Sequence, residues 1–286
     1  MPHLLDNLSE IAPDYDVMLC DVWGVIHNGL EAFPVACAAL EQWMRQRGPV
    51  ILISNSPRPR EGVLDQLNAL GVPRDAWSDI VTSGDVTRTL LSARIPGPAW
   101  RIGPDRDAPL YEGLGLQFSD LEEAAFIACT GPFDDEVETP EDYRVVLAKG
   151  AARGLDMICA NPDLMVQRGE RLVYCGGALA ALYETLGGRV MMAGKPFAPI
   201  YELSLARAEA QLSGVFNRRR VLAIGDGLAT DVAGARAQAL DMLFIAAGVH
   251  AADASDSSGR LDMKAVAATL TTAGGAPRYA MQRLVW

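Results

Sequence analysis

Short apolar runs alternate with longer amphipathic segments along most of the chain. Runs such as Val50–Ile53 have the length and composition of buried strands, and the segments between them carry apolar residues at helical spacing. Strands that alternate with helices in this way form parallel sheets, so we expect an α/β fold. The expected strands are 16–20, 50–53, 221–224 and 242–245, and the expected helices are 35–47, 60–70 and 230–239.

The middle of the chain repeats this alternation on a smaller scale. A chain of 286 residues has room for about two domains. We therefore predict an α/β core formed by residues 1–85 and 191–286, into which a smaller α/β domain of residues 86–190 is inserted. The strands expected in the insertion are 100–102, 125–128 and 157–159, its helices are 140–153 and 178–186, and residues 251–258 are expected to form a surface loop.

The chain is acidic, with 25 Lys and Arg residues against 36 Asp and Glu residues and a net charge of −11. Such a protein repels a phosphate backbone, so we expect no nucleic-acid partner. The one basic cluster, Arg218–Arg220, is expected to open a strand from an exposed loop. No apolar run of roughly 18 residues or more occurs, so we also expect no membrane span and no membrane partner.

Cysteine and histidine usage limits the other classes of site. The five cysteines include no Cys-x-x-Cys pair, and three of them lie in predicted strands, so buried free thiols in a reducing compartment are expected. The start of the sequence has no basic segment followed by an apolar stretch, which favours a cytoplasmic protein. The three histidines are far apart and form no zinc-type cluster.

Polar residues stand directly after the first two predicted strands, where ligands bind in open parallel sheets. Asp21 follows the first strand and precedes Gly24, so its carboxylate can act as a nucleophile or a metal ligand. Ser54 and Asn55 follow the second strand, and their hydroxyl and amide groups can donate hydrogen bonds to a phosphate. Taken alone, each also fits an ordinary role, because aspartate is common in turns and serine often caps a helix.

A lysine and two more acids occur near the end of the chain. Lys195 stands between a glycine and a proline, where it can neutralise a carboxylate and a phosphate; the alternative is a turn with a solvated lysine. No P-loop precedes it. Asp226 and Asp231 span the turn between a predicted strand and helix. Together with Asp21 they would form an oxygen-rich site that suits Mg²⁺, although Asp231 alone also fits a first-turn helix acid.

These residues, in this order, resemble the motifs of the haloacid dehalogenase (HAD) superfamily of phosphohydrolases. The superfamily pattern is matched by Asp21, Ser54, Lys195 and a Gly-Asp-x-x-x-x-Asp segment that ends at Asp231. The resemblance implies a Rossmann-like parallel-sheet core with an inserted α/β cap domain, and it covers nearly the whole chain, most weakly over 100–125 and beyond 250.

The insertion resembles the cap of subclass IIA, which includes nucleotide-monophosphate, sugar-phosphate and pyridoxal phosphate phosphatases. Three elements occur in the order typical of that subclass: Asn161-Pro162-Asp163, Cys175-Gly176-Gly177-Ala178 and Gly194-Lys195-Pro196. The subclass implies a small phosphorylated metabolite as substrate and a cap that selects it and can mediate a homodimer. Asn161 and Asp163 are expected near the interface between cap and core.

The resemblance also implies the chemical roles. Asp21 attacks phosphorus to give an aspartyl-phosphate, while Ser54 and Lys195 hold the transferring oxygens, where positioning and electrostatics dominate the rate. Asp226 and Asp231 bind Mg²⁺ together with Asp21 and the backbone carbonyl of Trp23. Asn55 supplies a hydrogen-bond donor to the substrate.

Trp23 departs from the family's Asp-x-Asp pattern. The second Asp protonates the leaving alcohol and then activates water, whereas an indole has one N–H donor and cannot act as acid or base. General acid–base catalysis contributes about 10²–10⁴-fold in rate, so slow turnover is expected unless another group substitutes. His27 titrates near neutrality and is a candidate substitute; a packed or exposed loop histidine is the alternative.

Two further functional classes remain open from the sequence. The first is a phosphate-ligand binding or sensing protein with a degenerate catalytic site, in which the indole of Trp23 stacks on a base, a pyridine or a sugar face. The second is a dinucleotide-binding oxidoreductase, because Gly225–Thr230 loosely mimics Gly-x-Gly-x-x-Gly after a strand. Against it, Asp226 would face the pyrophosphate, and Thr230 occupies the third glycine position.

Overall fold

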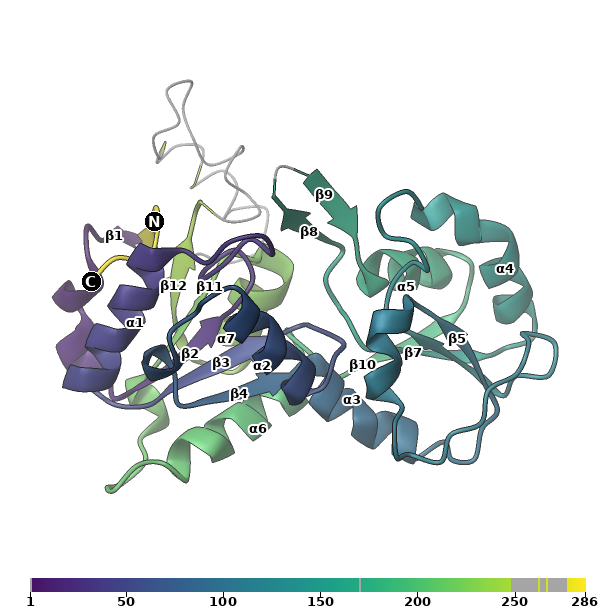
Figure 1. Ribbon diagram of the computed structural model, residues 1–286, viewed down its shortest axis with the longest axis horizontal. Helices are drawn as coiled ribbons and strands as arrows, with labels where there is room; N and C mark the ends of the chain where they lie inside the picture. Colours follow the sequence, from purple (N-terminus) through teal and green to yellow (C-terminus); the bar gives the residue numbers. More distant parts are fainter. Residues whose placement is uncertain (1, 170, 248–261, 263–265, 267–276) are drawn as a thin grey trace.

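The computed structural model describes residues 2–169, 171–247, 262, 266 and 277–286. The chain folds into two lobes that lie side by side (Figure 1). The larger lobe contains a seven-stranded sheet in the order β1-β13-β12-β11-β2-β3-β4, and every pair of neighbouring strands is parallel. Its strands are β1 (His3–Leu4), β2 (Val17–Asp21), β3 (Val50–Ser54), β4 (Asp79–Thr82), β11 (Val221–Gly225), β12 (Asp241–Ile245) and β13 (Tyr279–Met281).

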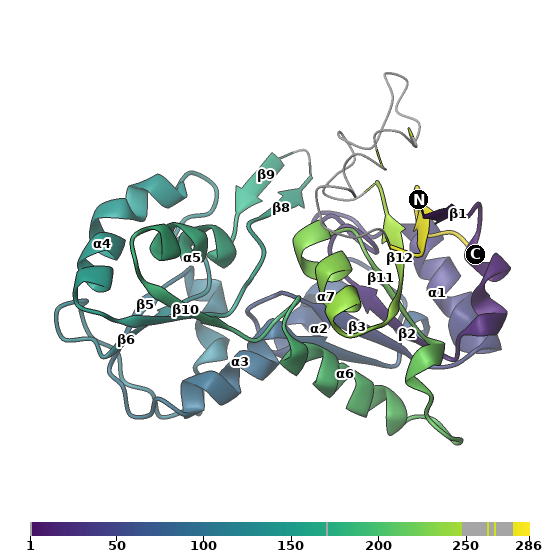
Figure 2. The ribbon, with the colours of Figure 1, turned by 180° about the vertical axis from the view of Figure 1, so that it is seen from behind.

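Helices cover both faces of this sheet, as the continuous apolar strands require (Figures 1 and 2). Trp43 and Leu67, from the first two helices, pack into the hydrophobic cluster on one face. Ile200 and Ala235 pack into the cluster on the other. The helices are α1 (Pro34–Gln46), α2 (Arg60–Ala69), α6 (Ala198–Glu209) and α7 (Ala233–Ala237), with short turns at Leu8–Glu10, Ala12–Asp14, Arg74–Ala76, Arg218–Arg220 and Leu228–Val232.

The smaller lobe contains a parallel four-stranded sheet in the order β10-β7-β6-β5. One face of the sheet is covered by Leu147 and Leu179 from two helices, and the other by Leu91 and Leu110. An antiparallel hairpin, β8–β9, projects from this lobe toward the larger one (Figure 1). The elements are β5 (Ala99–Ile102), a turn at Asp105–Leu110, β6 (Phe126–Cys129), a turn at Pro140–Tyr143, α4 (Arg144–Ala152), β7 (Asp156–Cys159), β8 (Met165–Arg168), β9 (Arg171–Tyr174), α5 (Gly176–Thr185) and β10 (Arg189–Met192).

Helix α3 (Ser83–Ser92) connects the two lobes, because it contacts both β4 and β7. Thr82 caps it: the Thr82 hydroxyl accepts from the Asp85 N–H, and the Asp85 carboxylate accepts from the Thr82 N–H. The predicted domain boundary at 85/86 therefore falls inside a continuous helix, and the one at 190/191 falls inside β10 of the smaller lobe.

The α/β class and the parallel sheets are confirmed, but two predicted helices differ from the structure. The segment 140–153 begins with a 3₁₀ turn and becomes α-helical at Arg144. In place of the helix expected at 230–239, the structure has a π-helical turn, Leu228–Val232, followed by a short α-helix, Ala233–Ala237. The expected loop at 251–258 lies outside the described residues.

The expectation of buried free thiols is confirmed, because all five cysteines are free and buried. No helix within the described part of the chain has both the length and the apolar character needed to cross a membrane.

Candidate active site

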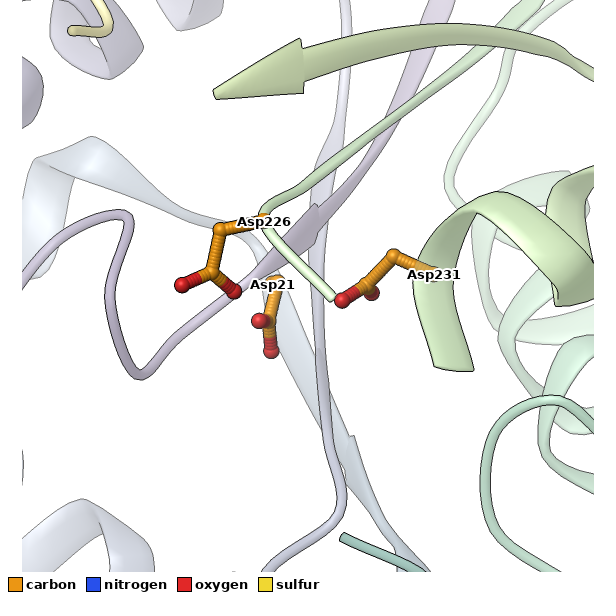
Figure 3. A group of neighbouring side chains, drawn as sticks. All are labelled: Asp21, Asp226 and Asp231. Atoms are coloured by element: carbon orange, nitrogen blue, oxygen red, sulfur yellow. The ribbon is translucent and has the colours of Figure 1, made fainter. Parts of the chain in front are cut away.

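Three buried carboxylates meet at the carboxyl ends of the central strands (Figure 3). Asp21 is the last residue of β2, Asp226 directly follows β11, and Asp231 comes from the π turn after it. Each offers one oxygen, and these oxygens lie within 4.8 Å of one another. Burial and the neighbouring Asp231 raise the pKa of Asp21. Such a cluster of carboxylate oxygens suits a divalent cation that prefers oxygen ligands, because the cation offsets the repulsion.

Two glycines make room for these acids. A Cβ at Gly24, where φ is +84°, would stand 2.1 Å from the Asp226 carboxylate, and one at Gly225 would stand 2.2 Å from Cγ of Asp231. Any larger residue would therefore displace an acid from the cluster. Residues 225–230, which loosely resemble a dinucleotide-binding loop, thus form the turn that places Asp231 close to Asp21.

Lys195 lies buried beneath the acids. Its Nζ atom is 2.6 Å from Oδ1 of Asp21 and 2.8 Å from Oδ1 of Asp231, and its side chain is only 2% exposed. Burial disfavours the charged ammonium, but Asp21 and Asp231 outweigh that effect and hold the pKa of Lys195 well above its usual value. The alternative of a solvated turn lysine is therefore wrong.

Asn55 forms hydrogen bonds with the backbone of Lys195 and with the side chain of Asp163, which lies just before the hairpin. Its Oδ1 accepts from the Lys195 N–H at 2.7 Å, and its Nδ2 donates to the Lys195 carbonyl at 3.2 Å and to Oδ1 of Asp163 at 2.9 Å. These contacts use both amide hydrogens. The structure therefore gives Asn55 a positioning role, whereas the sequence suggested a substrate donor.

Ser54 and Asn161 keep more of their hydrogen-bonding capacity. The Ser54 hydroxyl accepts from the Ser56 N–H at 3.2 Å and can still donate its own proton. Asn161 Oδ1 accepts from the Asp163 N–H at 3.2 Å, which shapes the turn at 161–163.

Burial raises the pKa of Asp163, although Lys195 and Asn55 act to lower it.

The indole of Trp23 contacts the hairpin of the smaller lobe. Its Nε1 donates to the backbone carbonyl of Gln167, 144 residues further along the chain. The ring packs edge-on against His27 and lies over Gly29, where a Cβ would collide with it. Trp23 thus joins the two lobes directly.

His27 is buried rather than exposed, and its Nδ1 accepts from the Gly29 N–H at 3.0 Å. Burial, and then the positive charge of Arg58, lower the pKa of His27 to about 4. The imidazole is therefore neutral at pH 7, which makes it unsuited to donate a proton there.

A cavity of about 640 Å³ separates the two lobes, and residues of both line it. It brings together every predicted site residue except Lys195, which lies behind the acids. Sequence reasoning missed several other charged and polar residues of the lining; for Arg58 the available signal was its place four residues after Ser54, between two prolines. The predicted residues in the lining are Asp21, Trp23, Ser54, Asn55, Asn161, Asp163, Asp226 and Asp231, and the missed ones include Arg58, Gln66, Arg106, Asp107, Asp135 and Arg168.

Comparison with known proteins identifies the family. Residues 18–117 match a model of haloacid dehalogenase-like hydrolases, and residues 192–273 match a second model, of HAD-hydrolase-like proteins. A crystal structure of a haloacid dehalogenase-like hydrolase from Brucella suis 1330 is 45% identical, covers 100% of both chains and superposes with a TM-score of 0.88. The chain belongs to the haloacid dehalogenase-like hydrolases.

Named relatives of this HAD-like hydrolase are phosphatases of the subclass IIA type. It is 28% identical over 255 residues to D-glycerol 3-phosphate phosphatase of Mycobacterium tuberculosis, covering 86% of this chain and 67% of that protein. It is 25% identical to the 5'-nucleotidase YutF of Bacillus subtilis, covering 82% and 88%. The HAD-like resemblance, the fold and the hydrolase class are thereby confirmed, in place of the oxidoreductase alternative.

Proposed function

We propose that this hydrolase is a Mg²⁺-dependent phosphatase that acts on a small phosphomonoester. The observation that carries the proposal is the buried cluster of Asp21, Asp226 and Asp231, joined by Lys195, beneath a cavity between two lobes. The relatives support the reaction class, because they are named as phosphatases of glycerol 3-phosphate and of nucleotides.

The donor set fits Mg²⁺. Asp21, Asp226, Asp231 and the backbone carbonyl of Trp23 would hold it with oxygen atoms alone, which is what this cation prefers. When bound, the cation reduces the repulsion between a carboxylate and a phosphate dianion and orients both.

Asp21 is the nucleophile in this proposal. Its Oδ1 is occupied by hydrogen bonds from Lys195 Nζ at 2.6 Å and from the Val22 N–H at 2.7 Å. Attack of the Asp21 carboxylate on phosphorus breaks the bond to the leaving alcohol and gives an aspartyl-phosphate. Water then attacks the same phosphorus, releasing inorganic phosphate and restoring the Asp21 carboxylate. Ser54 donates to a phosphoryl oxygen, and the positive charge of Lys195 favours the charge distribution of the transition state.

The leaving group must depart without a proton from residue 23. The indole of Trp23 cannot supply one, and His27 is neutral at pH 7 because its pKa is about 4. We therefore propose that the protein hydrolyses alkyl phosphates slowly and aryl phosphates faster, because aryl leaving groups are stable as anions.

The second candidate function is a phosphate-ligand binding or sensing protein. It is favoured by Trp23, which contributes a large aromatic surface to the cavity in place of an acid. Because the indole N–H is already bonded to Gln167, only the ring remains for stacking on a ligand.

Phosphate release from a panel of aryl, sugar and nucleotide phosphates, with Mg²⁺ and with EDTA, separates the two candidates. A phosphatase releases phosphate from at least one compound, and EDTA abolishes the release. Micromolar binding in calorimetry, with no release from any compound, would favour the sensing protein and contradict the phosphatase.

A further inference from the structure

Arg58 stands out among the charged residues of the cavity because no carboxylate pairs with it. Its Nη2 donates to the side-chain oxygen of Gln66, and within the described residues it forms no ion pair. Burial lowers the pKa of Arg58, and the positive charges of Arg106 and Arg168 add to this effect, whereas the carboxylates of Asp107 and Asp65 oppose it without forming an ion pair with Arg58. A partly buried guanidinium without an anionic partner is costly, and an anion from a ligand would relieve that cost.

The other two arginines of the cavity differ, because both already form ion pairs with protein carboxylates. Arg168 binds Asp135 through two parallel hydrogen bonds of 3.1 and 2.7 Å, and Arg106 also pairs with Asp135. Arg168 pairs with Glu136 as well, at 3.0 Å. Arg58 is therefore the cavity arginine left to receive a negative group of a ligand.

The backbone around Arg58 is held in place before any ligand binds. Pro59 restricts the φ and ψ angles of Arg58, Pro57 has its own φ fixed, and the Arg58 N–H donates to the Ser56 hydroxyl at 3.3 Å. The loop also packs tightly on the start of α3, since a Cβ at Gly84 would stand 2.3 Å from the Pro57 carbonyl. A guanidinium on such a rigid loop loses little freedom when it binds an anion.

We propose that Arg58 determines specificity by binding a second anionic group of the substrate, a carboxylate or a second phosphate, while the first phosphate lies at Asp21. The inference rests on the proposed phosphatase activity and narrows its substrate class to phosphomonoesters with two anionic ends. Guanidinium suits both anions, because its planar fork donates two parallel hydrogen bonds to either.

Two matched substrate pairs test the proposal and distinguish the two anions. In the first, 3-phosphoglycerate carries a carboxylate where glycerol 3-phosphate carries an alcohol; in the second, fructose 1,6-bisphosphate adds a phosphate to fructose 6-phosphate. The wild type is expected to favour the member with the second anionic group, in one of the pairs, by about 10- to 100-fold in kcat/KM, since hydrogen bonds to charged groups have this effect. In Arg58→Met the preference falls to within about 2-fold. Arg58→Lys, which keeps the charge without the fork, retains part of it.

Arg45→Met is the matched control, because Arg45 lies exposed on α1 and outside the cavity lining. It removes the same charge and should leave the preference unchanged. An unchanged preference in Arg58→Met, or no preference in the wild type for either compound with a second anionic group, would overturn the role of Arg58.

Measurements of ligand binding test the role of Arg58 even if the protein hydrolyses none of these substrates. Calorimetry of 3-phosphoglycerate, glycerol 3-phosphate and the two fructose phosphates with Asp21→Asn protein should give the same preference, lost in Asp21→Asn/Arg58→Met. Absence of turnover with this preference intact would refute the phosphatase but keep the anion site, and equal binding within both pairs would refute the anion site.

Discussion

The indole nitrogen of Trp23, in the larger lobe, donates a hydrogen bond to the backbone carbonyl of Gln167 in the hairpin of the smaller lobe. A second link lies beside it, where the Gly169 N–H donates to the Asn28 carbonyl at 3.3 Å. Trp23, at the position where the family resemblance implies an acid, therefore links the larger lobe to the hairpin of the smaller lobe. Together the two hydrogen bonds hold the hairpin against residues 23–28 of the larger lobe.

Removing only this hydrogen bond should loosen the hairpin. Trp23→Phe keeps an aromatic ring against His27 but loses the N–H, so amides of residues 165–169 and 171–174 should exchange about 2- to 10-fold faster, as expected for one neutral hydrogen bond. Hydrogen–deuterium exchange with mass spectrometry measures this directly. Trp286→Phe is the control, because Trp286 lies at the end of the chain, outside the cavity lining. Equal exchange in wild type and Trp23→Phe would show that the contact does not hold the hairpin.

Restoring an acid at residue 23 should restore the proton transfer. Trp23→Asp is expected to raise kcat for an alkyl phosphate such as glycerol 3-phosphate by about 10²-fold, the lower end of the effect of a general acid. The rate with p-nitrophenyl phosphate should change far less, because its leaving group needs no proton. Trp23→Asn has the same shape without the acid and serves as the control. A similar gain in both variants would attribute the effect to the lost indole.

Crowding the acid cluster should weaken the binding of Mg²⁺ that we propose for it, without unfolding the protein. In Gly225→Ala the new methyl group would displace the Asp231 carboxylate, so we expect the Kd for Mg²⁺ to rise by about 10-fold or more, in keeping with the loss of ligand positioning. Gly214→Ala is the matched control, because no atom lies within 4 Å of a Cβ there. Isothermal calorimetry with MgCl₂ compares the two. Unchanged binding in Gly225→Ala would remove Asp231 from the ligand set.

The buried imidazole of His27 should make stability depend on pH. Its pKa is about 4 in the folded protein against a usual value near 6.5, so the unfolded state binds more protons between these values. The free energy of unfolding therefore falls as the pH drops from 6.5 toward 4, with a loss of about 2 kcal/mol between pH 7 and pH 5. Denaturant titrations at both pH values should show this loss in the wild type.

His27→Asn should reduce that pH dependence by the same amount, whereas His3→Asn, at an exposed site, should leave it unchanged. An identical pH dependence in wild type and His27→Asn would mean that the folded protein accommodates the charged imidazole.

Much of the core and all three acids of the cluster could be predicted from local sequence. The strands that carry Asp21 and Ser54 are continuous apolar runs, and parallel pairing brings their ends level, with Asp21 opposite Ile53. The short strand β4, which begins with Asp79, and the partly exposed hairpin β8–β9 lack such runs and were missed. Contacts such as Trp23 to Gln167 and the burial of Lys195 depend on how distant segments pack, which no local pattern specifies.

The central claim is that Asp21 carries a metal-dependent phosphoryl transfer. The most direct test is phosphate release from p-nitrophenyl phosphate by wild type, Asp21→Asn and the surface control Asp75→Asn, each with Mg²⁺ and with EDTA. We predict that Asp21→Asn lowers the rate by about 10³-fold or more, as expected for loss of a nucleophile, that EDTA lowers it comparably, and that Asp75→Asn matches the wild type. Mg²⁺-dependent release that persists at the wild-type rate in Asp21→Asn would contradict the account.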